Sequence, residues 1–537
     1  MKLLSFDLMK FVETANRIRA NAIENDRLIE NPSDKELRLL LEKEPDIVKT
    51  KYNNFVALSD PTSRAAMFTK NSVDSVFGEE ERRLLTQCEE ALGKKRLISI
   101  DRTVGNKESK TIARLIVPSW LAHVAYGGKQ LFGPLKGTVK EPTYQVLFFF
   151  DEAFETNKLK PLPEKDVTIR LAMLDDGRVV KIVRNSSYIG EFKKGVFAAE
   201  DWNSKKRGGI FLHAGCREDY LQSAIGDYCN VRSLFLALSA NGKTSTTCRI
   251  LARKGNEKSW LIQDDGGSLM PDGSFHGFEF GGLFVKTESV NPGDQREIFY
   301  GLLKPDTIFE NVHVTKDGDL DFYNLDKTSN GRAVIPLRDF MHASPYIGVD
   351  KIDNFILITR GPLIPAIAKL TLEQAVALMV LGQAMESSAG DPTKAGQIRS
   401  EFFYDPFIAG DRAEHANRFY SIIKNLPHIN YFVLNTGGVG EGIRYKEITL
   451  EHTMGILDSL LRGGFEGIWI DSPSGFKVPK AVRTLDDIYL HPEKLYSRAE
   501  FVEKQKQLNQ FRQRAIKKIG SNLHPNIKAI FNKQSSE

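Results

Sequence analysis

Residues Leu238–Ser245, with the sequence LSANGKTS, restrict the fold of this chain more than any other segment, because they directly follow an apolar run ending at Ala237. Such a run followed by a turn ending in Gly-Lys-Thr fits the phosphate-binding pattern GxxxxGK[ST], except that Ala237 replaces the first glycine. In this kind of loop, backbone N–H groups hold phosphate oxygens, Lys243 adds positive charge and Thr244 can ligate Mg²⁺. Alanine resists the left-handed backbone angles that glycine allows, so an ordinary turn is an equal alternative for this motif alone.

The length and composition indicate a globular protein with more than one packed unit. A chain of 537 residues exceeds the size at which a single hydrophobic core stops growing. Hydrophobic residues make up 41% and charged residues 27% of the chain, which argues against wholesale disorder. The net charge of +5 is too small for a nucleic-acid binder of this length, so we expect small anionic ligands and no nucleic acid.

The cysteine and hydropathy patterns predict a soluble, cytoplasmic protein. Four cysteines, Cys88, Cys216, Cys229 and Cys248, form no CxxC pair and are too sparse for a disulfide framework. The N-terminal segment is amphipathic and has no apolar stretch followed by a cleavage site, as a secretion signal would have. No stretch approaches the roughly 20 apolar residues that span a bilayer, so we expect no membrane partner.

The spacing of apolar residues predicts a mixed α/β or α+β architecture. Residues 1–95 are expected to be mainly helical, with Ser33 or Asp34 capping the second helix. Between residues 96 and 215, short β-branched or aromatic runs predict strands, namely RLISI, ARLIVP, YQVLFFF, VTIRLAML and VVKIVR. The tetrapeptide DDGR at Asp175–Arg178 is a hairpin signal between the last two of these runs.

A second block with its own core begins near residue 210. It mixes short strands with glycine turns and becomes helical after Thr371, which has capping-box spacing to Gln374. Further helices are predicted at 412–425, 448–462 and 495–520. We therefore predict an N-terminal α+β domain over residues 1–210 and a C-terminal domain over residues 211–537.

Acidic and basic residues flank the Gly-Lys-Thr loop along the chain. Asp264 and Asp265 lie side by side at the end of a predicted strand, where adjacent carboxylates suit a cation that bridges phosphate oxygens. Upstream, Lys193 and Lys194 follow a strand, and His213 lies in an apolar run. Each has an ordinary alternative, because Asp-Asp-Gly-Gly is common in turns, paired lysines are usually solvated, and a lone histidine is more often part of a core.

The order of these motifs resembles the ATP-dependent phosphoenolpyruvate carboxykinase family. Its members carry a GEMKKG-type segment, an MHCSAN-type histidine, an LSGTGKTTLS loop and a DDEHGW-type motif, which parallel GEFKKG, LHAG, LSANGKTS and QDDGG here. FEFGGLFVKT, ENVHV, KTSNGRAVIP and YFVLNTGGVGEG also follow family segments in order, so the resemblance covers residues 100–480. It implies a two-domain fold whose C-terminal domain contains the phosphate-binding loop and binds nucleotide and metal.

The resemblance implies a Mn²⁺ site formed by Lys194, His213 and Asp265. A lysine ligates a metal only as the neutral amine, so its pKa would have to fall well below the ordinary value of about 10.4. A neighbouring divalent cation and the adjacent Lys193 would lower it.

The resemblance also implies roles for the loop. Thr244, supported by Asp264, would hold the Mg²⁺ bound to the nucleotide, and Lys243 would neutralise charge on the transferred phosphoryl group. The residues implied to bind nucleotide are Leu238, Ser239, Ala240, Asn241, Gly242, Lys243, Thr244, Ser245 and Thr453.

On the substrate side, the resemblance implies two arginines and two further residues. Arg102 and Arg332 would grip carboxylate or phosphate groups with their planar guanidinium forks. Tyr188 would line the position of the carboxylate or CO₂, and Lys193 would contact the phosphoryl group in transit.

The chain also departs from the family pattern. The motif QDDGGSL lacks the Glu-His-Gly-Trp tail, and Ala240 and Asn241 stand where glycine and threonine are usual. Phe280 occupies the usual glutamate position before Gly-Gly, although Glu279 is one residue away and can compensate if the backbone shifts. Val104–Lys107 replaces a proline-lysine run. The chain is therefore expected to be a divergent member.

The implied activity is conversion of oxaloacetate and ATP into phosphoenolpyruvate, CO₂ and ADP, with Mn²⁺ and Mg²⁺ as cofactors, in a monomer or small homo-oligomer. A kinase of the same fold that acts on another acceptor, and an inactive nucleotide-binding regulator, are the alternatives. Basic residues near the C-terminus are interpreted as the solvated face of an amphipathic helix: Lys504, Lys506, Arg512, Arg514, Lys517 and Lys518.

Overall fold

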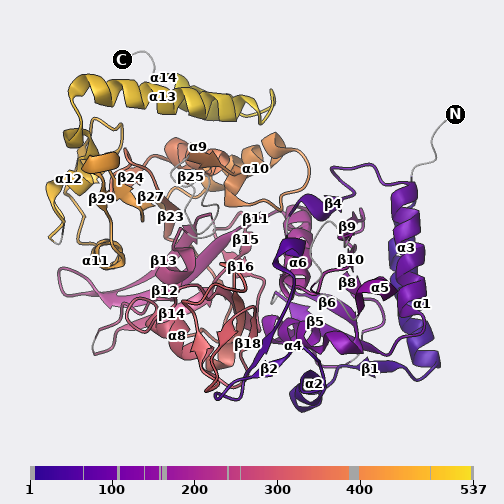
Figure 1. Cartoon of the computed structure of the whole chain (residues 1–537). Helices are drawn as coiled ribbons and strands as arrows, with labels where there is room; N and C mark the ends of the chain where they lie inside the picture. The colour runs from indigo at the N-terminus through magenta and orange to yellow at the C-terminus, as the bar shows by residue number, and fades with distance from the viewer. Residues whose placement is uncertain are drawn as a thin grey trace. The chain divides into compact units, whose positions relative to one another are not determined.

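The computed structural model describes two compact units of mixed α/β structure (Figure 1). The described residues are 6–64, 66–105, 109–137, 139–155, 159, 166–238, 241–253, 255–385, 398–483 and 485–533. The first unit comprises Met1–Arg207 and Phe278–Met341, and the second comprises Gly208–Gly277 and His342–Glu537.

The division differs from the predicted boundary in one respect. The chain leaves the first unit after Arg207, close to the predicted position near 210, but Phe278–Met341 packs with the first unit. The physical reason is strand pairing, because β18 (Ile308–Glu310) lies parallel to β3 (Phe55–Ala57), a partner from the N-terminal segment. Sequence texture reveals no such pairing between distant segments.

The largest sheet of the first unit has the strand order β1-β5-β6-β8-β10-β9-β4, with β7 paired to β5. Its strands are β1 (Leu28–Glu30), β4 (Thr69–Asn71), β5 (Leu97–Val104), β6 (Thr111–Pro118), β7 (Gly133–Pro134), β8 (Tyr144–Phe149), β9 (Thr168–Met173) and β10 (Val179–Arg184). The five predicted strands between residues 96 and 215 are confirmed as β5, β6, β8, β9 and β10. The Asp175–Arg178 hairpin is also confirmed, because β9 and β10 pair antiparallel across it.

The first 95 residues are less helical than predicted. They contain α1 (Met9–Glu24), α2 (Asp34–Leu41) and α3 (Glu79–Leu92), and Ser33 is the N-cap of α2. Apolar faces of α1 and α3, which lie side by side in Figure 1, share a core with strands of the large sheet. The same segment also contributes the short strands β1, β2 (Val48–Lys49), β3 and β4, of which β1, β3 and β4 pair with strands far along the chain and β2 pairs with β3.

A smaller sheet of the first unit has the order β17-β21-β18-β3-β2. It includes β17 (Gly282–Lys286) and β21 (Arg332–Pro336), and a separate hairpin is formed by β19 (His313–Val314) and β20 (Leu320–Asp321). The remaining helices of this unit are α4 (Ala122–Leu131), α5 (Glu152–Glu155), α6 (Gly190–Ser204) and α8 (Arg296–Leu302).

The second unit is built on a sheet with the order β14-β12-β13-β23-β27-β24-β31-β30. Its strands are β12 (Ala214–Gln222), β13 (Tyr228–Leu236), β14 (Lys258–Gln263), β23 (Asn354–Thr359), β24 (Ile367–Leu370), β27 (Asn430–Asn435), β30 (Trp469–Asp471) and β31 (Lys477–Pro479). In its centre β13, β23 and β27 run parallel, so their carboxyl ends meet at one edge. This edge is where open α/β sheets place ligands.

A second sheet and two hairpins complete the strands of this unit. The second sheet has the order β11-β15-β16-β22, and the two hairpins are β25-β26 and β28-β29. The strands of the sheet are β11 (Ile210–Leu212), β15 (Gly267–Leu269), β16 (Phe275–Gly277) and β22 (Gly348–Val349). Those of the hairpins are β25 (Gln383–Met385), β26 (Ile398–Ser400), β28 (Gly438–Val439) and β29 (Lys446–Glu447).

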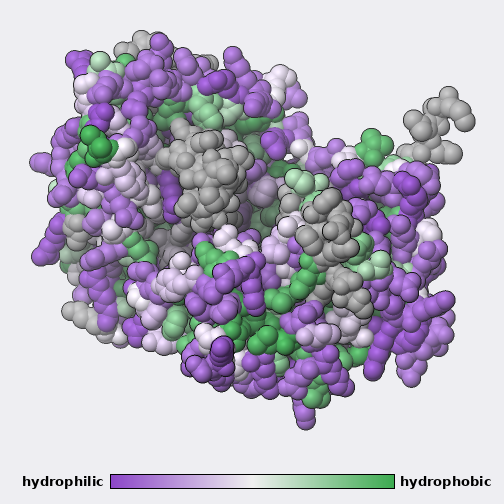
Figure 2. Space-filling view, viewed as in Figure 1, coloured by the Kyte–Doolittle hydropathy of each residue, from purple (hydrophilic) through white to green (hydrophobic). Residues whose placement is uncertain are grey.

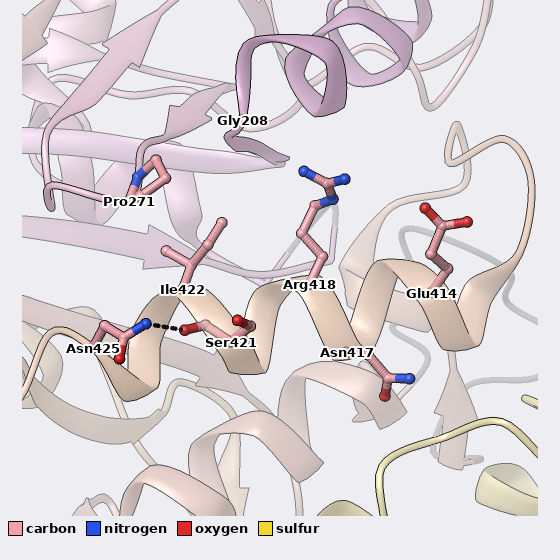
Figure 3. Close-up of a pocket in the computed structure, with 8 residues that line it drawn as sticks. All are labelled: Gly208, Pro271, Glu414, Asn417, Arg418, Ser421, Ile422 and Asn425. Carbon is pink, nitrogen blue, oxygen red and sulfur yellow. Dashed lines mark hydrogen bonds between the residues drawn. The ribbon is translucent and has the colours of Figure 1, made fainter.

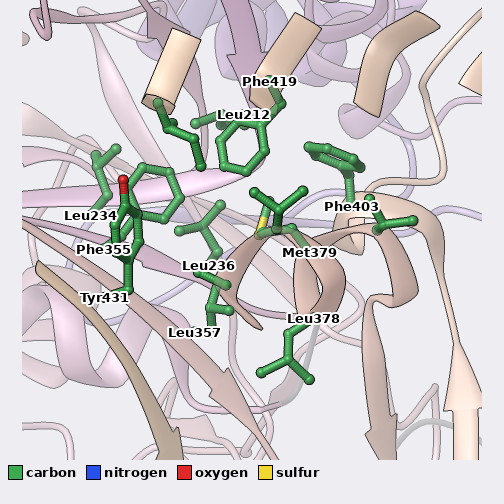
Figure 4. Close-up of a cluster of buried hydrophobic side chains, with 14 of the residues drawn as sticks. Leu212, Leu234, Leu236, Phe355, Leu357, Leu378, Met379, Phe403, Phe419 and Tyr431 are labelled. Carbon is green, nitrogen blue, oxygen red and sulfur yellow. The ribbon is translucent and has the colours of Figure 1, made fainter. Parts of the chain in front are cut away.

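Helices pack over the sheet of the second unit through a large apolar core. Figure 4 shows Leu236 and Phe355 of the central strands beside Met379 and Phe419 of two helices, all fully buried. The helices are α7 (Lys243–Cys248), α9 (Leu372–Leu381), α10 (Arg412–Lys424), α11 (Leu450–Leu461), α12 (Asp487–Leu490), α13 (Arg498–Lys517) and α14 (Pro525–Lys533). The helices predicted after Thr371 and at 412–425, 448–462 and 495–520 are thus confirmed.

The capping box predicted at Thr371 is present. The Thr371 side chain accepts a hydrogen bond from Gln374 N at 3.2 Å, and Thr371 N donates to Gln374 Oε1 at 2.9 Å. We expect Thr371→Ala to destabilise the second unit by about 1 kcal/mol, because the first turn of α9 loses an acceptor. Urea denaturation should show a lower midpoint with an unchanged slope.

Two variants control this prediction. Thr371→Ser keeps the capping oxygen and should retain most of the stability. Thr86→Ala removes an exposed hydroxyl from the middle of α3 and should change the midpoint little. An unchanged midpoint for Thr371→Ala would contradict the assigned role of the cap.

The chain shows no membrane-spanning feature among the described helices. None of them is both long and apolar enough to cross a bilayer. The outer parts of the face drawn in Figure 2 are mostly hydrophilic, as expected for a surface that contacts water. The four cysteines are free thiols, as the cysteine pattern predicted.

Candidate functional site

The predicted phosphate loop connects β13 to α7 in the second unit. Gly242 adopts a left-handed conformation with φ of 89° and precedes α7, so glycine is required there. Lys243 and Thr244 form the first turn of α7, whose N-terminal N–H groups point toward the loop. Ser239 and Ala240 lie outside the described residues.

Lys243 and His213 converge on the carboxylate of Asp265. Lys243 Nζ and His213 Nε2 both contact Asp265 Oδ1, the histidine at 2.9 Å. The lysine and histidine side chains are almost fully buried, whereas that of Asp265 is 22% exposed. The structure therefore brings together three of the residues predicted to surround the phosphate groups.

The hydrogen bonds of His213 favour a cation at Asp265. Its Nδ1 lies 2.8 Å from the carbonyl oxygen of Tyr404, which can only accept, so the Nδ1 proton is donated there. The unprotonated Nε2 and Asp265 Oδ1 would then be two electron-pair donors 2.9 Å apart, and a proton or a metal ion must lie between them. Imidazole nitrogen and carboxylate oxygen are both ordinary metal ligands.

An uncommon backbone geometry orients the carbonyl of Tyr404 toward His213. Phe403 and Tyr404 both have positive φ values, 54° and 56°, which non-glycine residues rarely adopt. Strain of this kind is concentrated at functional sites because the surrounding structure must impose it. Nothing in the local sequence FFY signals this geometry.

Of the other predicted ligands of the second unit, Asp264 and Thr244 lie at α7, and Thr453 lies in α11. Asp264 is buried, and its backbone oxygen packs against the helix, since a Cβ added at Gly215 would meet both Asp264 O and the Thr247 side chain. Thr244 is half-buried in the first turn. Thr453 lies in α11, where its hydroxyl donates to Thr449 O at 3.1 Å within the helix. No described contact joins Thr453 to the loop.

In the first unit, Tyr188, Lys193, Lys194 and Arg332 form a cationic cluster around aromatic rings. Arg332 Nε donates to the Tyr188 hydroxyl at 3.4 Å, and Lys194 Nζ lies 4.9 Å from the centre of the Tyr188 ring. Lys193 and Arg332 both lie within 6 Å of the Phe284 ring centre. The structure thus gathers four predicted residues into one cluster.

A buried glutamate, Glu191, links this cluster to the large sheet. Glu191 Oε1 accepts from Lys194 Nζ and Oε2 accepts from Lys181 Nζ, both at 2.7 Å. Burial opposes ionisation of Glu191, but the two lysines outweigh it and hold its pKa at about 2. Burial lowers the pKa of Lys194, but Glu191 outweighs it and raises the pKa above the ordinary value. To ligate a metal, Lys194 would have to leave Glu191 and lose a proton.

Glu279, rather than Phe280, places its side chain beside Lys193. Glu279 is buried and lies 2.8 Å from Lys193 Nζ, whereas Phe280 is 36% exposed. The following Gly281 lies so close to the backbone of Phe132 that a Cβ would clash with it. The carboxylate that contacts Lys193 therefore belongs to Glu279, the residue next to the usual glutamate position.

Arg102 occupies a different position from the cluster. Its Nε and Nη2 donate to the carbonyl oxygen of Phe132 at 3.0 and 2.6 Å. Burial lowers the pKa of Arg102 to about 10. Within the described residues Arg102 makes no ion pair.

Sequence reasoning missed three residues of these arrangements: Lys181, Glu191 and Tyr404. The contact between Glu191 and Lys194 could have been predicted from the sequence, because the two residues are three positions apart and such pairs face each other on a helix. Lys181 is a polar residue that is buried within a strand, and Tyr404 acts through its backbone oxygen. No local signal marks either of them.

The predicted metal ligands are divided between the units. Lys194 belongs to the first unit, and His213 and Asp265 belong to the second. In the part of the chain that the structure describes, no three His, Cys, Asp or Glu side chains gather as a metal cluster, and the predicted set contains only two such residues.

The second unit also has an open cavity of about 420 Å³ along α10. Figure 3 shows the side chains of α10 that line it, with Asn425 donating to the backbone oxygen of Ser421. Gly208 and Pro271 complete the lining. None of the predicted site residues lines this cavity.

Both units carry buried cationic side chains with matching carboxylates on a mixed α/β fold, which is typical of enzymes that act on small anionic compounds. The chain belongs to the ATP-dependent phosphoenolpyruvate carboxykinase family, because the phosphoenolpyruvate carboxykinase family model matches residues 53–487.

Individual relatives are distant. Phosphoenolpyruvate carboxykinase (ATP) of Aeropyrum pernix is 30% identical over 318 residues, which are 59% of this chain and 62% of that protein. The protein of the same name from Wigglesworthia glossinidia brevipalpis is 26% identical over 430 residues, or 76% of this chain and 72% of that protein. The one from Campylobacter jejuni is 25% identical over 320 residues, or 58% and 57%. Two of these alignments thus span less than two thirds of the relative, and the low identities fit the expected divergence.

Proposed function

We propose that this protein converts oxaloacetate and ATP into phosphoenolpyruvate, CO₂ and ADP. The observation that carries the proposal is the convergence of Lys243 and His213 on Asp265, directly beside the Gly-Lys-Thr loop. Family membership supports the same reaction, since the relatives are named for it.

In the second unit, the loop would bind the phosphates of ATP. Backbone N–H groups at the start of α7 would hold phosphate oxygens, and Lys243 would neutralise charge on the transferred phosphoryl group. Thr244 and Asp264 would hold Mg²⁺. The proposed nucleotide ligands are Leu238, Ser239, Ala240, Asn241, Gly242, Lys243, Thr244, Ser245 and Thr453.

A Mn²⁺ ion would be held by Lys194, His213 and Asp265. When bound, it supplies the positive charge that stabilises the enolate left by loss of CO₂. Tyr404 O would keep the His213 proton on Nδ1 and leave Nε2 available to the metal. Once the Lys194 amine has lost its proton, it would no longer form an ion pair with Glu191.

The first unit would bind oxaloacetate and phosphoenolpyruvate. Arg332 and Lys193 would contact anionic oxygens, because both are cations beside the Phe284 ring. Tyr188 would line the position from which CO₂ leaves, with Arg332 fixing its hydroxyl. Arg102 would bind a carboxylate with the part of its guanidinium that does not bond Phe132 O. We propose a cytoplasmic monomer or small homo-oligomer.

One assay tests the proposal against its alternatives. Purified protein with Mn²⁺, Mg²⁺, ATP and oxaloacetate should form phosphoenolpyruvate and ADP in equal amounts. ATP-dependent phosphorylation of another acceptor without phosphoenolpyruvate would support a kinase of the same fold instead. Tight nucleotide binding without any turnover would support an inactive regulator. Lys243→Met supplies the control, because it should abolish product formation while the protein stays folded.

A further inference from the structure

Arg360 lies at the carboxyl edge of the parallel strands in the second unit. It directly follows β23, between the ends of β13 and β27 in the sheet. The register pairs Thr359 with Asn435, so Arg360 is level with Thr436. The phosphate loop leaves the same edge after β13, and ligands of open α/β sheets bind at such edges.

Two neighbouring residues connect Arg360 to the loop. Thr436 N donates to Thr359 O at 3.0 Å, and the Thr436 hydroxyl donates to the loop carbonyl of Asn241 at 2.8 Å. The next residue, Gly437, supports the stem of Arg360, because a Cβ there would lie 2.9 to 3.2 Å from its Cβ, Cγ and Cδ. The side chain and the loop therefore contact consecutive residues of one turn.

The guanidinium group of Arg360 has no acceptor within the described residues. Its Nε is buried and unbonded, and the side chain makes no hydrogen bond or ion pair with any described residue. Burial lowers its pKa, and the nearest compensating groups are Tyr445 and Glu447, neither of which forms an ion pair with it. A buried donor left unsatisfied costs free energy, so Arg360 Nε calls for an acceptor from a bound ligand or an ordered water.

We propose that Arg360 is a further nucleotide-binding residue, which contacts a phosphate of the nucleoside polyphosphate held by the loop. A planar guanidinium with unused N–H groups matches phosphate oxygens. Lys243 lies at the start of α7 beside Asp265, whereas Arg360 lies beside Gly437, so Arg360 contacts the polyphosphate from the Thr436–Gly437 side. This inference rests on the proposed nucleotide site and adds to it a residue outside the loop motif.

The test compares binding of ADP, adenosine and phosphoenolpyruvate by calorimetry in wild type, Arg360→Met and Arg360→Lys. Arg360→Met should weaken ADP binding by about 10- to 100-fold, the effect expected for loss of a charge-assisted hydrogen bond. Adenosine and phosphoenolpyruvate should bind as to wild type. Arg360→Lys should bind ADP with intermediate affinity, because it keeps the charge and loses the fork.

A matched control and a stability measurement separate binding from a structural role. Arg444→Met removes an arginine of the turn between β28 and β29, one that is already paired with Glu500, and should leave ADP binding unchanged. The melting temperature of ligand-free Arg360→Met should equal or exceed that of wild type, because an unsatisfied buried donor is removed. The rise in melting temperature on adding ADP should be smaller.

Several results would overturn the inference. These are unchanged ADP affinity in Arg360→Met, equal loss of ADP and adenosine binding together with a lower melting temperature, weakening confined to phosphoenolpyruvate, or absence of ADP binding in wild type. A wild-type protein that binds ADP through Arg360 but forms no phosphoenolpyruvate would refute the proposed reaction and leave this inference intact.

Discussion

Asp265→Asn should lower the rate of phosphoenolpyruvate formation by about 10³-fold. Asp265 Oδ1 contacts both Lys243 Nζ and His213 Nε2, so Asp265 holds these two side chains together. An amide keeps the shape but loses the charge, and its NH₂ group would repel the Lys243 ammonium group. Mn²⁺ affinity should fall by more than about 100-fold, since even partners of metal ligands contribute 10- to 100-fold.

Steady-state kinetics and Mn²⁺ binding by electron paramagnetic resonance measure the two effects. Asp272→Asn serves as the matched control, because Asp272 is an exposed aspartate of the same unit that bonds only within its own turn. Both variants should melt cooperatively near the wild-type temperature. Activity of Asp265→Asn within tenfold of wild type would remove Asp265 from the proposed metal site.

Glu191→Gln should destabilise the first unit by about 3–5 kcal/mol, the range for breaking a buried ion pair from one side. Lys181 is fully buried and would lose the one carboxylate that it contacts among the described residues, and Lys194 would lose the same partner. Chemical denaturation at neutral pH measures the change in the free energy of unfolding.

The same substitution should alter the dependence of stability on pH. The folded-state pKa of Glu191 is about 2, well below its ordinary value of 4.5. A carboxyl group with a depressed pKa contributes stability above its unfolded-state pKa and loses it as the pH falls toward its folded-state pKa. The stability difference between wild type and Glu191→Gln should therefore be full above about pH 4.5 and shrink toward pH 2.

Two further variants identify the cause. Glu89→Gln breaks an exposed ion pair with Arg17 and should cost less than about 1 kcal/mol. The double variant Lys181→Met with Glu191→Gln removes the buried charge along with its partner and should recover part of the lost stability. A double variant less stable than Glu191→Gln alone would show that the penalty does not arise from an unpaired Lys181.

Much of the fold and part of the site were predictable because their signals are local. Runs such as YQVLFFF have the composition of buried strands, and the Thr371–Gln374 box, the Asp175–Arg178 turn and the predicted helices all appear in the structure. The same holds for the position of Asp264 and Asp265 at a strand end. Each of these depends on residues within a few positions of one another, so the sequence contains the information directly.

By itself, the sequence determined the family, the order of the motifs and the residue types offered to phosphate and metal. Only the tertiary structure decided that Phe278–Met341 joins the first unit, that Glu279 meets Lys193, that Tyr404 O bonds His213 and that Arg360 lies beside the turn contacting the loop. These contacts join residues at least 77 positions apart, which is the separation of Arg360 and Gly437. Long-range pairing depends on how whole sheets assemble, and no local pattern of residues specifies it.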